Sequence, residues 1–221
     1  MKTKIIIVLA FFIAVVFGSL SCNIFDSGSS SSGTSPIGGD PSPMGSVGNT
    51  FEVPALPGTS DRSIEVTSRS GDVSTITGSA IITDPTYLSI AQALPFIQVD
   101  GDRASASQKY RVTKRGIQNV FDDGKFLTIV NYNAKVGDTY KLKRDGHTIE
   151  RRVTKVSKED DFLWGFMYIK TIQVEETGTG IPGVSKLKYY ANHRFGIVGM
   201  DIFFEDGSTQ YIYVYSDAYN D

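Results

Sequence analysis

Four Asp-Gly dipeptides constrain the fold of this chain more than any other feature of its 221 residues. Each lies between short segments in which apolar and polar residues alternate, as in strands with one buried face. In that setting Asp-Gly favours a tight β-hairpin, because both central residues of a type I′ turn need positive φ. We therefore predict an all-β, mainly antiparallel fold: a curved sheet, a sandwich or an open half-barrel. The four pairs are Asp100-Gly101, Asp123-Gly124, Asp145-Gly146 and Asp206-Gly207.

Two of these turns predict strand registers. A two-residue turn at Asp145-Gly146 pairs Leu142 with Ile149 and Lys141 with Glu150. The same turn at Asp206-Gly207 pairs Phe204 with Thr209. One face of that second hairpin, which we expect to be buried, then carries Val198, Met200, Ile202, Phe204, Tyr211, Tyr213 and Tyr215.

One short helix interrupts the strands. Asp84-Pro85 provides an N-cap and a first-turn proline, so the helix is expected over Thr86 to Leu94, before Pro95. Further strands are predicted at Ser63–Ser68, Val73–Ile82, Lys109–Lys114, Phe126–Tyr132, Phe162–Glu175 and Val184–Tyr190.

The N-terminus has the layout of an export signal. Lys2 and Lys4 precede 13 apolar residues, Ile5 to Phe17, and small residues follow up to Cys22. This length suits a signal-peptide core and falls short of the roughly 20 residues that span a bilayer.

This layout resembles a bacterial lipoprotein signal. The resemblance implies that residues 1–21 are removed and that Cys22, the only cysteine, is acylated, for example with palmitate. It departs from the usual pattern because Ser19 stands where leucine is common. The alternative is an ordinary secretory signal that leaves Cys22 as a free thiol.

The segment after Cys22 is predicted to be a flexible linker over residues 22–50. Ser27 to Asn49 is mostly Ser, Gly and Pro, a composition that buries little apolar surface. A tether of this length has a mean reach of about 30 Å. Residues 51–221 then form a single β-rich domain, which is long enough for a substantial core.

The charge is uneven along the chain. Without Lys2 and Lys4, 20 basic residues oppose 24 acidic ones, whereas Arg103 to Lys158 holds 14 basic and 5 acidic residues. This basic segment could contact anionic lipid, lipopolysaccharide or acidic glycans, or it could be a set of solvated strand faces. Nucleic acid is not expected, because the exported chain is acidic and lacks a recognition motif.

The candidate catalytic motifs fail on their context. Gly178 to Gly183 matches a dinucleotide-binding fingerprint, but Pro182 and a following strand replace the helix that it needs. His193 has no partner spacing for zinc, and Asp100 with Asp102 lacks the remaining ligands of a calcium loop. We therefore predict no enzyme activity, no catalytic residue, no metal and no cofactor.

Aromatic residues give the one candidate binding site. Phe162, Trp164, Phe166 and Tyr168 alternate with further apolar residues, so both faces of this strand are apolar. The strand is either central in a two-layer structure or lines an apolar cavity. We take these four side chains as the candidate lining of a ligand cavity.

A second resemblance rests on three short motifs. Val136 to Tyr140, Tyr189-Tyr190-Ala191 and Gly196-Ile197-Val198 are similar to a pattern in lipid-anchored envelope proteins. The resemblance implies a curved antiparallel sheet like that of half-barrel lipoprotein carriers, and it implies no catalytic residue.

These observations predict a lipoprotein of the bacterial cell envelope, held at the outer membrane or its periplasmic face, or exposed at the surface. The first hypothesis is a non-catalytic binding module for a lipid or other apolar ligand. The alternative is a structural or assembly protein that binds an envelope protein or glycan. A cavity of roughly 300 Å³ or more favours the first, and a filled core with an exposed apolar patch favours the second.

Overall fold

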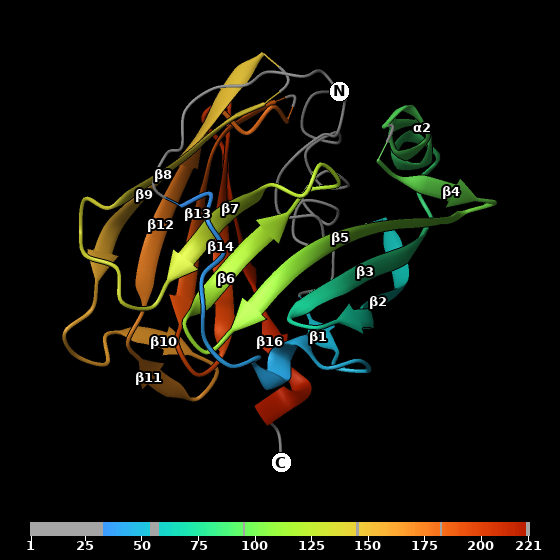
Figure 1. The fold of residues 1–221 in the computed structure, drawn as a ribbon. Helices are drawn as coiled ribbons and strands as arrows, with labels where there is room; N and C mark the ends of the chain where they lie inside the picture. Colours follow the sequence, from blue (N-terminus) through green and yellow to red (C-terminus); the bar gives the residue numbers. More distant parts are fainter. Residues whose placement is uncertain (1–32, 54–57, 95, 145, 182, 220–221) are drawn as a thin grey trace.

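Two antiparallel sheets of six strands each form the body of the molecule (Figure 1). The computed structural model describes residues 33–53, 58–94, 96–144, 146–181 and 183–219, so the predicted signal and Cys22 lie outside the described residues. The first sheet has the order β2-β3-β5-β6-β7, with β4 beside β5, and the second has the order β15-β14-β13-β12-β9-β8. Over the described residues the fold is therefore all-β with one short α-helix, as predicted.

The strands of the first sheet are β2 (Thr59–Ser70), β3 (Val73–Ile82), β4 (Gln98–Asp100), β5 (Arg103–Thr113), β6 (Gly116–Val120) and β7 (Phe126–Asn131). Those of the second are β8 (Thr139–Arg144), β9 (His147–Val156), β12 (Ile172–Thr177), β13 (Val184–Asn192), β14 (Gly196–Phe204) and β15 (Thr209–Tyr213). Two short pairs complete the strands, β1 (Phe51–Glu52) with β16 (Tyr215–Ser216) and β10 (Phe162–Trp164) with β11 (Met167–Ile169). The helices are η1 (Pro43–Gly45), α2 (Pro85–Ala93) and η2 (Asp217–Tyr219).

The main core lies between the two sheets. Leu127 and Ile129 of the first sheet share it with Leu187 and Met200 of the second, and all four are fully buried. A second core lies under α2, which covers the part of the first sheet that the second sheet leaves open (Figure 1). The Asp84 carboxylate caps α2 by accepting a hydrogen bond from the Thr86 amide at 2.8 Å, which confirms the predicted start of the helix.

The β8–β9 hairpin has the predicted register. Leu142 pairs with Ile149, and Lys141 pairs with Glu150 across the strands, with an ion pair of 2.8 Å. The Lys141 ammonium, with a smaller contribution from Arg152, lowers the pKa of the Glu150 carboxyl.

The β14–β15 register differs from the prediction by one residue. Asp201 pairs with Tyr211, and Met200 pairs with Ile212. The loop has three residues instead of two, and it closes with a hydrogen bond from the Phe204 amide to the Ser208 carbonyl at 2.9 Å. A shift of one residue turns every side chain of a strand to the other face. Ile212 and Val214 are therefore buried, while Tyr211, Tyr213 and Tyr215 lie on the outer face of the second sheet.

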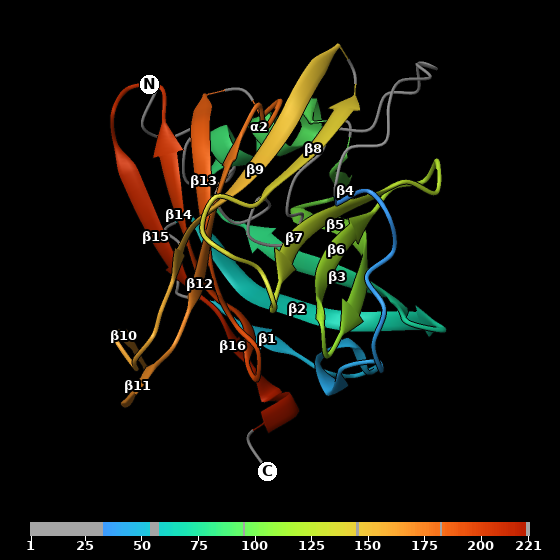
Figure 2. The same ribbon diagram turned by 60° about the vertical axis from the view of Figure 1, so that its left-hand side comes forward.

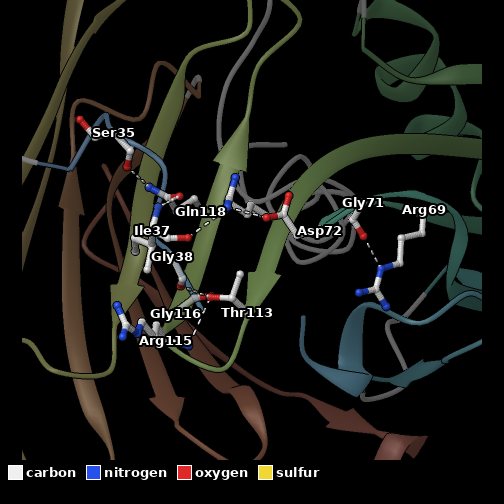
Figure 3. Close-up of polar contacts among 11 residues, drawn as sticks. Ser35, Ile37, Gly38, Arg69, Gly71, Asp72, Thr113, Arg115, Gly116 and Gln118 are labelled. Atoms are coloured by element: carbon white, nitrogen blue, oxygen red, sulfur yellow. Dashed lines mark hydrogen bonds and ion pairs between the residues drawn. The ribbon is translucent and has the colours of Figure 1, made fainter. Parts of the chain in front are cut away.

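Residues 33–50 correct the predicted extent of the flexible linker. They lie along the domain, hydrogen-bonded to β5, β6 and β7 (Figures 2 and 3). The Gln118 side chain accepts from the Ile37 amide at 2.8 Å and donates to the Ser35 carbonyl at 2.9 Å, in the manner of a neighbouring strand. We call residues 33–50 the strap.

The strap is fixed at further points. Arg111 donates to the Ile37 carbonyl at 2.9 Å and is itself held by Asp72 at 2.5 Å. Met44, in η1, is only 3% exposed and packs into the main core. The strap thus belongs to the folded domain, which begins well before residue 51.

Candidate functional site

The four predicted cavity residues lie on a separate β-hairpin. Residues 162–169 do not continue into β12 as the single predicted strand, because the chain turns back at Gly165-Phe166. Phe162 pairs with Ile169 and Trp164 with Met167. Gly165 has φ of +57°, which suits the first central position of a two-residue hairpin loop and is a conformation that glycine adopts readily.

One face of this hairpin packs on aromatic residues at the outer face of the second sheet. The Phe162 ring stacks on Tyr190 with centroids 4.8 Å apart, and Trp164 contacts Phe195 at 4.6 Å and Tyr215 at 5.1 Å. The indole N–H of Trp164 donates to the Val214 carbonyl at 3.1 Å. Aromatic pairs at such distances contribute about 0.5–1.5 kcal/mol each beyond their buried area. The base of the hairpin is therefore well fixed.

The other face and the turn of the hairpin are exposed. Leu163 and Tyr168, which pair across the strands on that face, expose 54% and 61% of their surface, and Phe166 at the turn is fully exposed. Met167 pairs with Trp164 and lies on the packed face, but beside the turn it still exposes 48% of its surface. Figure 2 shows the hairpin projecting from the end of the second sheet where β9 ends and β12 begins. We call Leu163, Phe166, Met167 and Tyr168 the hairpin tip. These side chains form the candidate interaction surface of the domain.

This placement corrects the predicted cavity lining. Trp164 is buried and Phe162 is half-buried, but both face the aromatic side chains of the second sheet. Phe166 and Tyr168 face solvent. The strand has two apolar faces because one packs on the sheet and the other is exposed, an arrangement that neither predicted alternative contained.

The outer tyrosines extend the aromatic surface beside the hairpin. Tyr213 lies between Tyr211, at 4.3 Å, and Tyr215, at 6.4 Å between ring centroids. Tyr190 donates to the Asp201 carboxylate at 2.6 Å. Burial and, next, this hydrogen bond raise the pKa of the Tyr190 phenol. Tyr213 is 40% exposed and borders the hairpin's aromatic base.

The charges next to the hairpin are mixed. Residues 162–169 contain no Lys, Arg, Asp or Glu, whereas exposed Lys158, Glu159 and Asp160 precede them and exposed Lys170 follows. Asp161 is held by Lys155 at 2.7 Å and by Ser157 at 2.6 Å, and these contacts lower the pKa of its carboxyl. The hairpin tip is thus an apolar island bordered by charges of both signs.

The apolar cavity of the domain lies elsewhere. It is bordered by the strap, β1 and both sheets, through residues such as Met44, Phe51, Ile76, Tyr110, Ile117 and Val214. Its volume is about 50 Å³, far below the roughly 300–1,000 Å³ of small-molecule sites. A lipid chain does not fit there without movement of the sheets.

A polar hollow of about 240 Å³ lies on the first sheet beside β8. Lys109 and Asp122 form an ion pair of 3.2 Å at its rim, and the Arg144 guanidinium lies 4.5 Å from the Phe121 ring centroid. The charged residues of the hollow therefore contact one another or a neighbouring ring. The volume of the hollow is also below the roughly 300–1,000 Å³ of small-molecule sites.

A buried ionic network joins the two sheets. Arg151 donates to Glu176 at 2.5 Å, to the Leu127 carbonyl at 3.1 Å and to Asn119 at 2.7 Å. Tyr189 donates to the same Glu176 oxygen at 2.9 Å. Burial would lower the pKa of Arg151, but Glu176 above all raises it, and the balance is a raised pKa. This network was not predicted from the sequence. Arg151 alternates with Ile149 and Val153, and this spacing was the signal that could have placed its side chain on the buried face of β9.

The other motifs also have structural positions. His193 is exposed, and the glycine-rich segment lies between β12 and β13. Within the described ranges, no three residues among His, Cys, Asp and Glu come together as metal ligands. No helix in the part of the chain that the structure describes is long and apolar enough to cross a membrane.

No protein-family model matches the chain, and no curated protein shows significant similarity to it. A solved structure that is similar is that of a Bacteroides fragilis protein with a YmcC-like fold, which is thought to be exported. It is 10% identical, covers 78% of this chain and 95% of its own, and has a TM-score of 0.40. A likeness this distant carries no function over to the present chain.

Proposed function

We propose that this chain is a non-catalytic, lipid-anchored protein of the bacterial cell envelope. It is held at its membrane through acylated Cys22 and binds a partner through the hairpin tip. The anchor rests on the sequence pattern around Cys22, and the binding surface rests on the exposed hairpin. The proposal assigns no catalytic residue and no cofactor.

The observation that carries the binding function is the contrast between the two faces of one hairpin. The inner face is fixed by Trp164 and Phe162, while the outer face exposes Leu163 and Tyr168. Phe166 in the turn and Met167 beside it add to this exposed apolar surface. Exposing such residues on a rigid support costs solubility, and it favours association with a partner that covers them. The small cavity between the sheets supports this reading over that of a carrier with an enclosed ligand.

The strap brings the domain close to the anchor. Only ten residues, and so eleven Cα–Cα steps, lie between Cys22 and Gly33, where the Thr128 amide donates to the Gly33 carbonyl at 3.0 Å. A flexible chain of that length has a mean reach of about 17–20 Å, so the expected distance from the membrane is shorter than the sequence suggested.

Site-specific photo-crosslinking in intact cells tests the binding surface. A photoreactive residue replaces Phe166 in one variant and Val47 in the control. Val47 is also apolar and is 61% exposed, but it lies in the strap. The amide of the residue after it, Gly48, donates a hydrogen bond to the Val66 carbonyl of β2. We expect adducts with protein or lipid from position 166 and none from position 47. Absence of adducts from both positions would refute binding through the tip.

A further inference from the structure

We infer that the partner of the hairpin tip is the lipid bilayer that carries the Cys22 anchor. This inference rests on the proposed function, because it names the partner of the same surface. The molecule would then touch its membrane at two points, the acyl chains and the hairpin tip.

The size of the tip favours a bilayer over a protein. A standard protein interface uses about 20–30 residues on each side. The hairpin tip offers Leu163, Phe166, Met167 and Tyr168, with charged residues next to them in the sequence. Four side chains at the end of a projecting hairpin are enough to enter the headgroup region, where apolar groups are buried without a complementary protein surface.

The chemistry of the tip is graded along the hairpin. Phe166, the most exposed side chain, lies at the turn, and Met167 lies directly behind it, paired with the buried Trp164. The pair Leu163 and Tyr168 follows, and the amphipathic ring of Tyr168 suits the membrane–water interface. The nearby charges are mixed, with Lys158, Lys170 and Arg194 beside Glu159 and Asp160, so binding depends on apolar burial and only weakly on salt.

The anchor's reach allows both contacts at once. The eleven Cα–Cα steps from Cys22 to Gly33 span at most about 36–40 Å when extended. A domain of this size has a radius of gyration of about 16 Å, so the extended chain is more than twice that length and lets the domain turn its hairpin towards the membrane. Once Cys22 is anchored, insertion of the tip becomes an intramolecular event at an effective concentration of order millimolar. A weak insertion is therefore sufficient to orient the domain.

Fluorescence quenching in vesicles tests the inference. The mature lipidated protein is reconstituted in phosphatidylcholine vesicles that contain lipids spin-labelled on their acyl chains. Because acylation occupies the Cys22 thiol, Met167→Cys supplies a single free thiol in the tip for a fluorophore, and Val47→Cys is the matched control.

We expect quenching of the probe at position 167, little at position 47, and only a small change on adding salt. Adding Phe166→Asp to the Met167→Cys protein should lower the docked population at least about tenfold. Because Phe166 packs on nothing, circular dichroism should show that this variant remains folded.

Equal quenching at both positions, or quenching that survives Phe166→Asp, would overturn the inference. If position 167 is not quenched but position 166 crosslinks to a protein in cells, the bilayer inference fails and the proposed function stands. If neither experiment gives a signal, both fail.

Discussion

Arg151 joins the two sheets through a buried ionic network. Its guanidinium, on β9, reaches Asn119 on β6, the Leu127 carbonyl on β7 and Glu176 on β12, and it is fully buried. A buried ion pair often adds little net stability over an apolar pair of similar size. Removing one partner, however, leaves the other charge buried without compensation.

Arg151→Met should therefore destabilise the domain by about 3–5 kcal/mol, because the Glu176 carboxylate keeps its burial and loses its counterion. Urea denaturation measures the change. Adding Glu176→Leu to Arg151→Met should recover much of the loss, since the unpaired charge is gone. A double variant as unstable as the single one would show that the guanidinium's bonds to Asn119 and Leu127, and not the charge balance, dominate.

Tyr140 gives the domain an alkaline limit. Burial, with a smaller effect from Asp138, raises the pKa of its phenol from 10.0 to about 12. Since the folded state favours the neutral phenol, this stabilisation is complete below pH 10 and is lost as the pH rises from 10 towards 12.

Tyr140→Phe should make the unfolding free energy fall less steeply over that pH range, while neutral stability changes by no more than about 1 kcal/mol. Denaturant titrations at several alkaline pH values provide the measurement. An identical pH dependence in the variant would mean that the other buried tyrosines, such as Tyr189, set the limit.

Among the elements, β15 is one for which the position of the turn was predicted correctly and the strand register was not. Asp206-Gly207 does form a hairpin turn, but the loop includes Glu205, so the pairing shifts by one residue. Both faces of the strand are apolar enough to be buried, with tyrosines on one and Ile212 and Val214 on the other. The pattern alone could not choose between them, whereas the charged Lys141 and Lys143 fixed the outer face of β8.

The register predicts opposite outcomes for two neighbours on β15. Ile212→Asp should cost more than about 3 kcal/mol, because it places a carboxylate in the main core. Tyr213→Asp should cost about 1 kcal/mol, since Tyr213 is partly exposed and loses mainly a ring contact. Thermal unfolding of the two variants compares these losses directly. A larger loss of stability for Tyr213→Asp than for Ile212→Asp would instead support the register of the two-residue turn.

The hairpin tip and the strap could not be predicted from the sequence, for different reasons. Gly165 was visible as an interruption of the aromatic strand, but nothing local shows that the chain folds back onto Tyr190 and Tyr215. The strap has the composition of a linker, and its order comes from Gln118, which lies 81 positions from Ile37. Short-range pairings such as Leu142 with Ile149 could be predicted because one turn determines them.

At the scale of the whole molecule, the class of fold followed from the turns and the alternation, while the arrangement of sheets did not. A two-sheet core with α2 beside it depends on contacts between distant segments, which a single sequence does not display. The same holds for function. The aromatic residues suggested a lined cavity, whereas the fold packs Phe162 and Trp164 on the second sheet and leaves Phe166 and Tyr168 outside, where a membrane or partner can cover them.

Membrane attachment at Cys22 underlies both the short tether and the docking of the hairpin tip. The most direct measurement of this attachment is the intact mass of the protein purified from its own membrane. We predict a chain of residues 22–221 with added acyl groups on Cys22. An unmodified cysteine, or a chain cut at another position, would contradict it.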